Sequence, residues 1–210
     1  MFLVAGLGCT YSQAVKIESL LIELEVISES RKPEAQLNLG IEYSLRDSFG
    51  LGLLYLTQAL HEAERLRLTN VVIEANYYLG DLYLQFDDLS NAQKHFFKAF
   101  QSSEKQGIAK MQVFCSAGLG SVYIETKDWQ LAKDYLRKAL LIAERKSLEK
   151  EIPKLFNLIG IVYSKSSQLD SALYNFEELL KLGIERNDSQ LIGFAYINIA
   201  DVYMISGRYN

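Results

Sequence analysis

The stretch Leu79-Gly80-Asp81-Leu82-Tyr83 decides the fold, because its pattern returns at a fixed interval along the 210-residue chain. A small residue, with Leu or Ile before it and Tyr three positions after it, recurs every 40 residues. The small residues are Gly40, Gly80, Gly120, Gly160 and Ala200, and the tyrosines are Tyr43, Tyr83, Tyr123, Tyr163 and Tyr203. Self-similarity at such a period indicates a repeat protein in which each repeat is one supersecondary unit.

Each repeat is predicted to be a pair of helices. Apolar residues step by three and four, as in Leu79, Tyr83 and Phe86, which is the spacing of one helix face and not the alternation of a strand. Short polar turns such as Asp87-Asp88 and Lys127-Asp128 separate the first helix of a unit (helix A) from the second (helix B). The sequence therefore predicts an all-α array of antiparallel helix pairs.

The glycines and prolines fit this prediction. Gly inside a helix costs about 1 kcal/mol relative to Ala, so its recurrence at one phase indicates a steric demand, such as two helix backbones crossing closely. Both prolines, Pro33 and Pro153, share one phase three periods apart. A helix tolerates Pro in its first turn, so each is expected where a helix A begins.

These repeats resemble the tetratricopeptide repeat family, whose units carry Leu-Gly-x-x-Tyr in helix A and an Ala, Phe or Tyr, Ala series in helix B. The resemblance covers residues 33–210 and implies a right-handed superhelical solenoid. The period of 40 exceeds the ~34 of the minimal repeat and resembles that of signalling-type members; we expect the extra length between helix B and the next helix A. The predicted units are 33–72, 73–112, 113–152, 153–192 and a truncated 193–210.

Residues 1–32 read as a degenerate sixth unit. Leu7-Gly8-Cys9-Thr10-Tyr11 repeats the phrase of the other units, and residues 15–30 are predicted to form an amphipathic helix. Alternatively, residues 1–14 are a signal-like segment before a capping helix, because they end in the small-x-small series Ser12-Gln13-Ala14, although no basic region precedes them. We expect a cytoplasmic protein, or an exported one if residues 1–14 are a truncated signal.

The last unit stops where its helix B should begin. A terminal solenoid helix needs a polar outer face, yet this one carries Phe194, Ile197, Ile199, Tyr203 and Met204. We interpret the chain as a fragment of a longer protein and expect that its unfinished end can self-associate.

Composition and motifs exclude several function classes. The 22 basic and 26 acidic residues are interspersed, which argues against a nucleic-acid surface, since that would show as a basic stripe. The longest uncharged stretch, residues 1–15, is too short for a membrane span. Cys9, Cys115, His61 and His95 lack the spacing of metal ligands or of a nucleophile with its base. We therefore expect no enzyme, no catalytic residue, no metal and no cofactor.

The resemblance implies that helices A line a concave surface whose variable side chains bind a ligand. Asn38 and Asn198 resemble groove asparagines that bind the backbone of an extended peptide, because an amide offers donor and acceptor together. The aromatic candidates either contact the ligand or pack between repeats, and both readings stay open. The ligand-groove candidates are Asn38, Tyr77, Tyr78, Asp81, Phe114, Ser121, Lys154, Asn157, Phe194, Asn198 and Asp201.

The leading functional prediction is a non-catalytic interaction scaffold that holds a peptide or helix of a protein partner in this groove. The alternative is a sensory or regulatory input domain of a larger signalling protein, such as a peptide-sensing transcription regulator. That alternative rests on a resemblance of the 40-residue units and groove asparagines to bacterial peptide-pheromone sensors.

Overall fold

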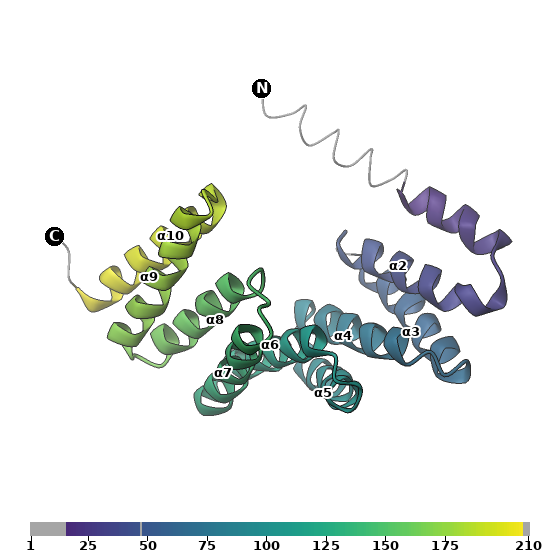
Figure 1. Cartoon of the computed structure of the whole chain (residues 1–210), viewed down its shortest axis with the longest axis horizontal. Helices are drawn as coiled ribbons and strands as arrows, with labels where there is room; N and C mark the ends of the chain where they lie inside the picture. Colours follow the sequence, from purple (N-terminus) through teal and green to yellow (C-terminus); the bar gives the residue numbers. More distant parts are fainter. Residues whose placement is uncertain (1–15, 47, 208–210) are drawn as a thin grey trace, which may run out of the picture. The chain divides into compact units, whose positions relative to one another are not determined.

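The computed structural model describes residues 16–46 and 48–207, and these residues form helices joined by short turns. The predicted all-α fold of antiparallel helix pairs is confirmed (Figure 1). Residues 16–26 are helical, and a short 3-10 helix, η1 (Glu29–Arg31), follows them. The remaining helices are α2 (Lys32–Ser44), α3 (Phe49–Arg65), α4 (Thr69–Gln85), α5 (Leu89–Gln106), α6 (Ala109–Glu125), α7 (Trp129–Arg145), α8 (Ile152–Lys165), α9 (Leu169–Glu185) and α10 (Ser189–Ser206).

The even-numbered helices are the predicted helices A, and the odd-numbered ones from α3 onward are helices B. The chain divides into two compact units, Met1–Ser102 and Ser103–Asn210. In the first unit α2 packs against α3 and α4, and in the second α8 packs against α6, α7, α9 and α10. Each unit has its own apolar core, centred on Leu56 and Leu79 in the first and on Leu136, Ile159 and Phe176 in the second.

The repeated glycine explains why the two helices of a pair approach so closely. A Cβ added at Gly80 would lie 2.8 Å from the Phe96 ring, and one added at Gly160 would lie 2.4 Å from the Phe176 ring. These distances are far below van der Waals contact, so only hydrogen fits at that position. The same holds at Gly40 and Gly120, where a leucine takes the place of the phenylalanine. The predicted steric demand is confirmed.

Turns recur every 20 residues, because each helix ends in the same way. From α3 onward, a residue with a positive φ lies one or two positions after each helix, as at Arg67 (58°) after α3 and Gly107 (68°) after α5. The next amide closes the helix end: Leu68 N–H donates to the Ala63 carbonyl at 2.8 Å, which is the Schellman geometry. The residues with positive φ are Arg67, Asp87, Gly107, Lys127, Ser147, Ser167, Asn187 and Gly207.

The extra residues of the 40-residue repeat lie in the helices. We had expected them in the connection between helix B and the next helix A, and that expectation is wrong. Only residues 66–68 separate α3 from α4, and only residues 107–108 separate α5 from α6. The longest such connection, residues 146–151, precedes α8. The helices instead extend, so that α4 begins at Thr69, four residues before the expected unit boundary at 73. Pro33 and Pro153 lie in the first turns of α2 and α8, as predicted.

The helix of residues 16–26 packs on the first unit. Ile17 is buried, and Leu20, Leu21, Leu24 and Ile27 are partly buried, so the predicted apolar face exists. The helix is shorter than the expected 15–30, because η1 interrupts it. Residues 1–15, which hold the degenerate phrase, Cys9 and the signal-like site, lie outside the described residues.

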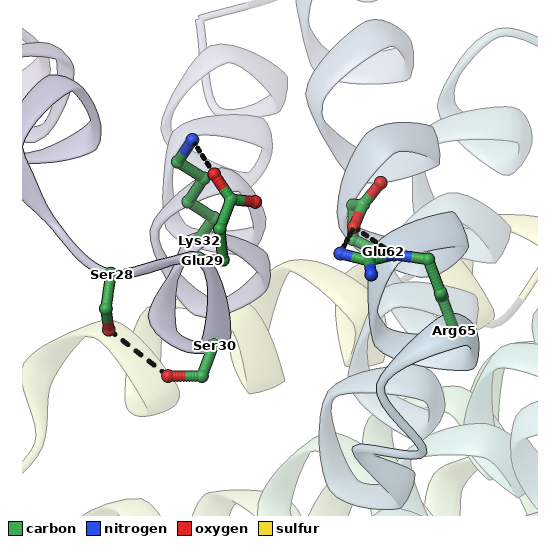
Figure 2. Close-up of polar contacts among 6 residues, drawn as sticks. All are labelled: Ser28, Glu29, Ser30, Lys32, Glu62 and Arg65. Atoms are coloured by element: carbon green, nitrogen blue, oxygen red, sulfur yellow. Dashed lines mark hydrogen bonds and ion pairs between the residues drawn. The ribbon is translucent and has the colours of Figure 1, made fainter.

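Exposed ion pairs stabilise the helix ends near η1 and at the end of α3 (Figure 2). Lys32 Nζ lies 2.5 Å from Glu29 Oε1, and Arg65 Nη2 lies 2.6 Å from Glu62 Oε2. Because these side chains are solvated, the pairs contribute little to the stability of the fold. Across residues 16–46 and 48–207, no helix is long and apolar enough to span a bilayer.

Candidate functional site

The candidates of the first unit lie on α2 and α4, and some of them serve the core. Tyr77 packs against the Phe96 ring at 5.8 Å between centroids and against Tyr78 at 5.1 Å. Tyr78 also packs on the core, and burial, with a smaller effect of the Glu74 charge, raises the pKa of its hydroxyl. The two tyrosines therefore pack between helices, although both also remain partly exposed.

The polar candidates of the first unit lie closer to solvent. Asn38 is exposed on α2. Asp81 on α4 is partly buried and accepts a hydrogen bond from Gln85 Nε2 at 2.9 Å, one helical turn away. Among the described residues, no hydrogen bond or ion pair joins Asn38 to Asp81.

Two candidates of the second unit take part in local packing on α6. The Phe114 ring packs against the core and lies 5.3 Å from Lys110 Nζ, which is cation–π range. Ser121 Oγ donates to the Ala117 carbonyl of its own helix at 3.1 Å. Both side chains are partly buried and are engaged in contacts on their own helix or in the core.

The remaining candidates come together on α8 and α10, around one hydrogen bond. Asn198 Nδ2 donates to Asn157 Oδ1 at 2.7 Å, although the two residues are 41 positions apart. An amide carries two donor hydrogens and an acceptor oxygen. The pair therefore still offers Asn157 Nδ2 as a donor and Asn198 Oδ1 as an acceptor.

A basic cavity of about 380 Å³ adjoins Asn157. Pro153, Lys154 and Asn157 line it from α8, and Phe194 lines it from α10. Its acid, Asp188, accepts hydrogen bonds from the amides of Gln190 and Leu191 at the start of α10, so its charge is engaged by the helix N-terminus. The lining residues that sequence reasoning missed are Lys150, Leu179, Arg186, Asp188 and Leu191.

Lys150 and Arg186 were missed for a physical reason. Both belong to connections between a helix B and the next helix A, whereas the candidates were selected by their phase on helices A. Arg186 is held in place because its Nη2 donates to the Glu149 carbonyl at 2.9 Å. A cluster of cations in consecutive connections was the signal that could have found them.

A second cavity, of about 440 Å³, is lined by Asn198, whereas the first is lined by Asn157. Asn198 and Asp201 line it together with Ser164, Lys165 and four apolar residues. The α8–α10 site, as we define it, consists of Lys154, Asn157, Phe194, Asn198 and Asp201 with the two cavities. The apolar neighbours include Ile161, Phe176, Met204 and Ile205.

A further cavity in the first unit, of about 710 Å³, holds none of the candidates. Gln36 and one stripe of α3, from Gly50 to Glu62, line it. Leu54 on this stripe is 47% exposed. We place the candidate site at α8 and α10 because the first-unit cavity offers no paired amides and no cluster of cations.

His95 serves the fold of the first unit. Asn76 Nδ2 donates to the Val72 carbonyl at 2.8 Å, so Asn76 Oδ1 accepts from His95 Nδ1–H at 3.0 Å. The imidazole stacks on Tyr83 at 5.5 Å. Burial, with smaller effects of Lys98 and Lys94, lowers the pKa of His95 to about 4, so the ring is neutral at pH 7.

Cys115 is fully buried on α6, and burial raises the pKa of its thiol to about 12. A thiol that is neutral and shielded from solvent is a core residue and a poor nucleophile. Within the part of the chain that the structure describes, no three His, Cys, Asp or Glu side chains lie close enough together to hold a metal ion.

Residues 108–185 match the family model described as tetratricopeptide repeat. No curated protein matches the chain at a significant level. Among solved structures, the chain is similar to BtubC (BKLC) from P. vanneervenii, with 19% identity and a TM-score of 0.76, over 94% of this chain and 82% of that one.

Two other solved structures have the same fold. One is aspartyl phosphate phosphatase F from Bacillus subtilis, with 16% identity and a TM-score of 0.76, over 87% of this chain and 49% of that one. The other is a Rap protein complexed with competence and sporulation factor, with 17% identity and a TM-score of 0.79, over 93% of this chain and 59% of that one. Tetratricopeptide repeats are typically non-catalytic and bind proteins. Residues 108–185 are therefore a tetratricopeptide repeat domain, within a chain whose described part has a TPR-like fold.

Proposed function

We propose that the chain is a non-catalytic interaction domain that binds an extended, acidic peptide segment of a protein partner at the α8–α10 site. The amide pair of Asn157 and Asn198 carries this proposal. The pair offers one donor and one acceptor side by side, which matches the backbone groups of a peptide. In a helix those groups already bond to one another, so an extended segment fits the pair better than a helix.

The charge of the first cavity supports an acidic segment. Lys150, Lys154 and Arg186 line it, and its one acid, Asp188, caps α10. A peptide carboxylate entering there would gain charge-assisted hydrogen bonds. Because these cations are close to solvent, the attraction should weaken as salt is added.

The second cavity supports an apolar residue in the same segment. Ile161, Phe176 and Met204 give it an apolar wall beside the polar Ser164, Lys165 and Asp201, and Asn198 lines it too. A segment whose backbone crosses the amide pair would place side chains on both sides of it, since successive side chains of an extended chain point in opposite directions. The predicted ligand therefore has Asp or Glu on one side of the pair and an aliphatic or aromatic residue on the other.

A displayed library of random linear peptides tests this proposal. Peptides enriched on the 210-residue chain should combine an acidic and an apolar residue. The double variant Asn157→Ala/Asn198→Ala should weaken their affinity at least about 10-fold in fluorescence polarisation, which corresponds to the loss of hydrogen bonds worth about 1.4 kcal/mol. The matched control is Asn38→Ala, an exposed asparagine on helix A of the first unit.

Two results would overturn the proposal. The first is a library that yields no specific binder. The second is a set of binders whose affinity is unchanged by the double variant or is reduced equally by Asn38→Ala. Circular dichroism of each variant should show unchanged helicity, so that a loss of affinity reports on the site.

The second candidate function is a sensory input domain, in which the same peptide acts as a signal. The likeness of fold to a Rap protein crystallised with a peptide factor favours it. A sensor must change conformation on binding, so amide hydrogen exchange should change in α2–α5 as well as at α8 and α10. Protection limited to α8 and α10 would favour the scaffold.

A further inference from the structure

In three of the four helix pairs from α2 to α9, the tyrosine of the repeated phrase stacks on a ring of the paired helix B. The two residues of each pair are 12 positions apart, and their ring centroids lie 5.5 Å apart with planes inclined by 7°, 19° and 18°. The fourth pair breaks this series, because Asn175 on α9 takes the position of the ring that would stack on Tyr163 of α8. The stacked pairs are Tyr43 with Tyr55, Tyr83 with His95, and Tyr123 with Tyr135.

A cavity of about 520 Å³ adjoins the position of the missing ring. Three helices of the second unit border it, and α8 packs on both α7 and α9. The space therefore depends on the side chains between packed helices and not on an end of the array. The lining residues include Arg137 and Leu140 of α7, Ile159 and Tyr163 of α8, and Tyr174 and Asn175 of α9.

Asn175 offers a hydrogen-bond acceptor in this cavity. Its side chain is buried (6% exposed), and Nδ2 donates to the Ser171 carbonyl, one turn earlier, at 2.7 Å. A carbonyl only accepts hydrogen bonds, so this contact fixes the amide and leaves Oδ1 as its other end. Among the described residues, no group donates to that oxygen. Because a buried acceptor without a donor costs free energy, a ligand that donates to Oδ1 would gain a favourable contact.

Two cations of α7 hold the Tyr163 ring in place. Lys133 Nζ lies 5.5 Å from the ring centroid, and the Arg137 guanidinium carbon lies 5.8 Å from it. Arg137 also donates a hydrogen bond to the Tyr163 hydroxyl. Arg137 is exposed, and no carboxylate of the described residues pairs with it. Its side chain can therefore turn toward solvent and uncover the Tyr163 ring for an incoming one.

The charges around the cavity favour an uncharged ligand. Glu144 and Asp170 line the cavity, and these two acids offset the two cations near Tyr163. A phosphate or carboxylate would face both acids, which is unfavourable, whereas a neutral ring with an O–H or N–H group would not. The equivalent positions of this chain hold a phenol or an imidazole, so the geometry of the repeat accepts a ring of that size.

We propose that the cavity between α7, α8 and α9 binds a tyrosine or tryptophan side chain of a protein partner. The incoming ring stacks on Tyr163, as Tyr135 stacks on Tyr123 in the preceding pair. Its O–H or N–H group donates to Asn175 Oδ1. The cavity shares no lining residue with the α8–α10 site, so this proposal stands independently of the peptide site.

A nuclear magnetic resonance titration of the ¹⁵N-labelled chain with N-acetyl-tyrosinamide tests the proposal. The backbone amide at position 175 should show a saturable shift with a dissociation constant of about 1 mM, the scale for a ligand of this size. N-acetyl-tryptophanamide should behave in the same way. N-acetyl-phenylalaninamide lacks the donor and should bind about 5-fold more weakly, and N-acetyl-leucinamide, the control for the backbone groups, should cause no saturable shift. No saturation by about 20 mM tyrosinamide, or equal binding of the leucine compound, would overturn the proposal.

Asn175→Tyr restores the ring that the other three pairs contain. It should fill the cavity, weaken binding of N-acetyl-tyrosinamide at least about 10-fold and raise the midpoint of thermal unfolding by about 3 °C. Glu177→Tyr adds the same side chain at an exposed position of α9 outside the cavity. This matched control should change neither binding nor the midpoint. Unchanged binding to Asn175→Tyr would contradict the site.

Asn175→Leu keeps the size of the side chain but removes the acceptor, and it tests the site even if the larger ring prevents folding. This variant should bind the tyrosine and phenylalanine compounds equally. A preference for tyrosinamide that persists in Asn175→Leu would overturn the assigned role of Oδ1. The double variant Asn157→Ala/Asn198→Ala should bind N-acetyl-tyrosinamide as the wild type does, and a 10-fold loss there would place the ring at the α8–α10 site instead.

Discussion

Gly160 on α8 and Ala200 on α10 occupy the same repeat position, yet their surroundings differ completely. The Phe176 ring covers Gly160 so closely that an added Cβ would lie 2.4 Å from it, whereas Ala200 is exposed. The helical pattern around both residues is the same. The comparison teaches that a repeat phrase specifies a helix and its apolar face, while burial of that face depends on whether a helix B packs against it.

The largest loss of stability is expected when the side chain that covers Gly160, Phe176, is truncated. Phe176→Ala removes a fully buried ring from the second core, and we expect a loss of about 4 kcal/mol in the free energy of unfolding. Phe194→Ala, on the exposed side of α10 (58% exposed), should change it by less than about 0.5 kcal/mol. Urea unfolding monitored by circular dichroism measures both, and equal losses would contradict the assignment of the core.

Adding one methyl group should have the next largest effect. Gly160→Ala introduces the Cβ that meets Phe176, so we expect a loss of about 2 kcal/mol despite the better helix propensity of Ala. Gly193→Ala, where the Cβ meets no atom within 4 Å, should instead gain about 0.5–1 kcal/mol. Urea unfolding measures both changes in the free energy of unfolding. Their opposite signs would sharpen the comparison between the covered and the uncovered glycine. A gain at both positions would show that the helices of the α8–α9 pair are not closely packed.

The stacked pairs of the two units should respond differently to pH. His95 stacks on Tyr83 in the first unit, and Tyr135 stacks on Tyr123 at the same repeat position in the second. The folded pKa of His95, about 4, is below its ordinary value of 6.5. Between those values the unfolded chain binds more protons, so stability should fall as the pH drops from about 6.5 to about 4.

His95→Tyr should remove this pH dependence, because it recreates the stacked pair of the second unit. The measurement is the urea midpoint at pH 7.5 and at pH 5, compared between wild type and variant. An equal drop in both proteins would assign the pH dependence to other groups.

The smallest predicted effect concerns the helix ends. Ser167 after α8 and Gly207 after α10 share one repeat position, with φ of 61° and 66°. A side chain strains this left-handed conformation, so Ser167→Gly should stabilise the chain by about 1 kcal/mol or slightly less. Thermal unfolding measures it, with Gln101→Gly, at an exposed position in the interior of α5, as a control that should destabilise. A loss at Ser167 would contradict the backbone conformation of the turn.

Periodicity predicted most of the fold, because it reports local and regularly repeated contacts. The small residue at Gly80, the first-turn prolines and the turn at Asp87-Asp88 all lie where the pattern placed them. The extra residues of the 40-residue period were misplaced, since a stretch such as residues 66–72 has no Gly or Pro to show where the helix resumes. The prediction assumed a loop, but the Schellman turn at Arg67 needs only three residues.

The candidate site was predicted only in part. Phase along helices A selected Lys154, Asn157, Phe194, Asn198 and Asp201, which the fold brings together. The same phase also selected side chains that pack in the core or bond within their own helix. It missed the cations of the connections, because a phase rule describes one face of a helix and not the loop beside it.

The amino-acid order alone specifies the helical repeat, which face of each helix is apolar and where glycine is obligatory, because these features depend on residues within one turn or one repeat. The hydrogen bond between Asn157 and Asn198 and the basic cavity depend instead on contacts between residues far apart in the chain. Such contacts arise only when neighbouring helices pack, since the packing decides which of several equivalent polar or apolar side chains meet.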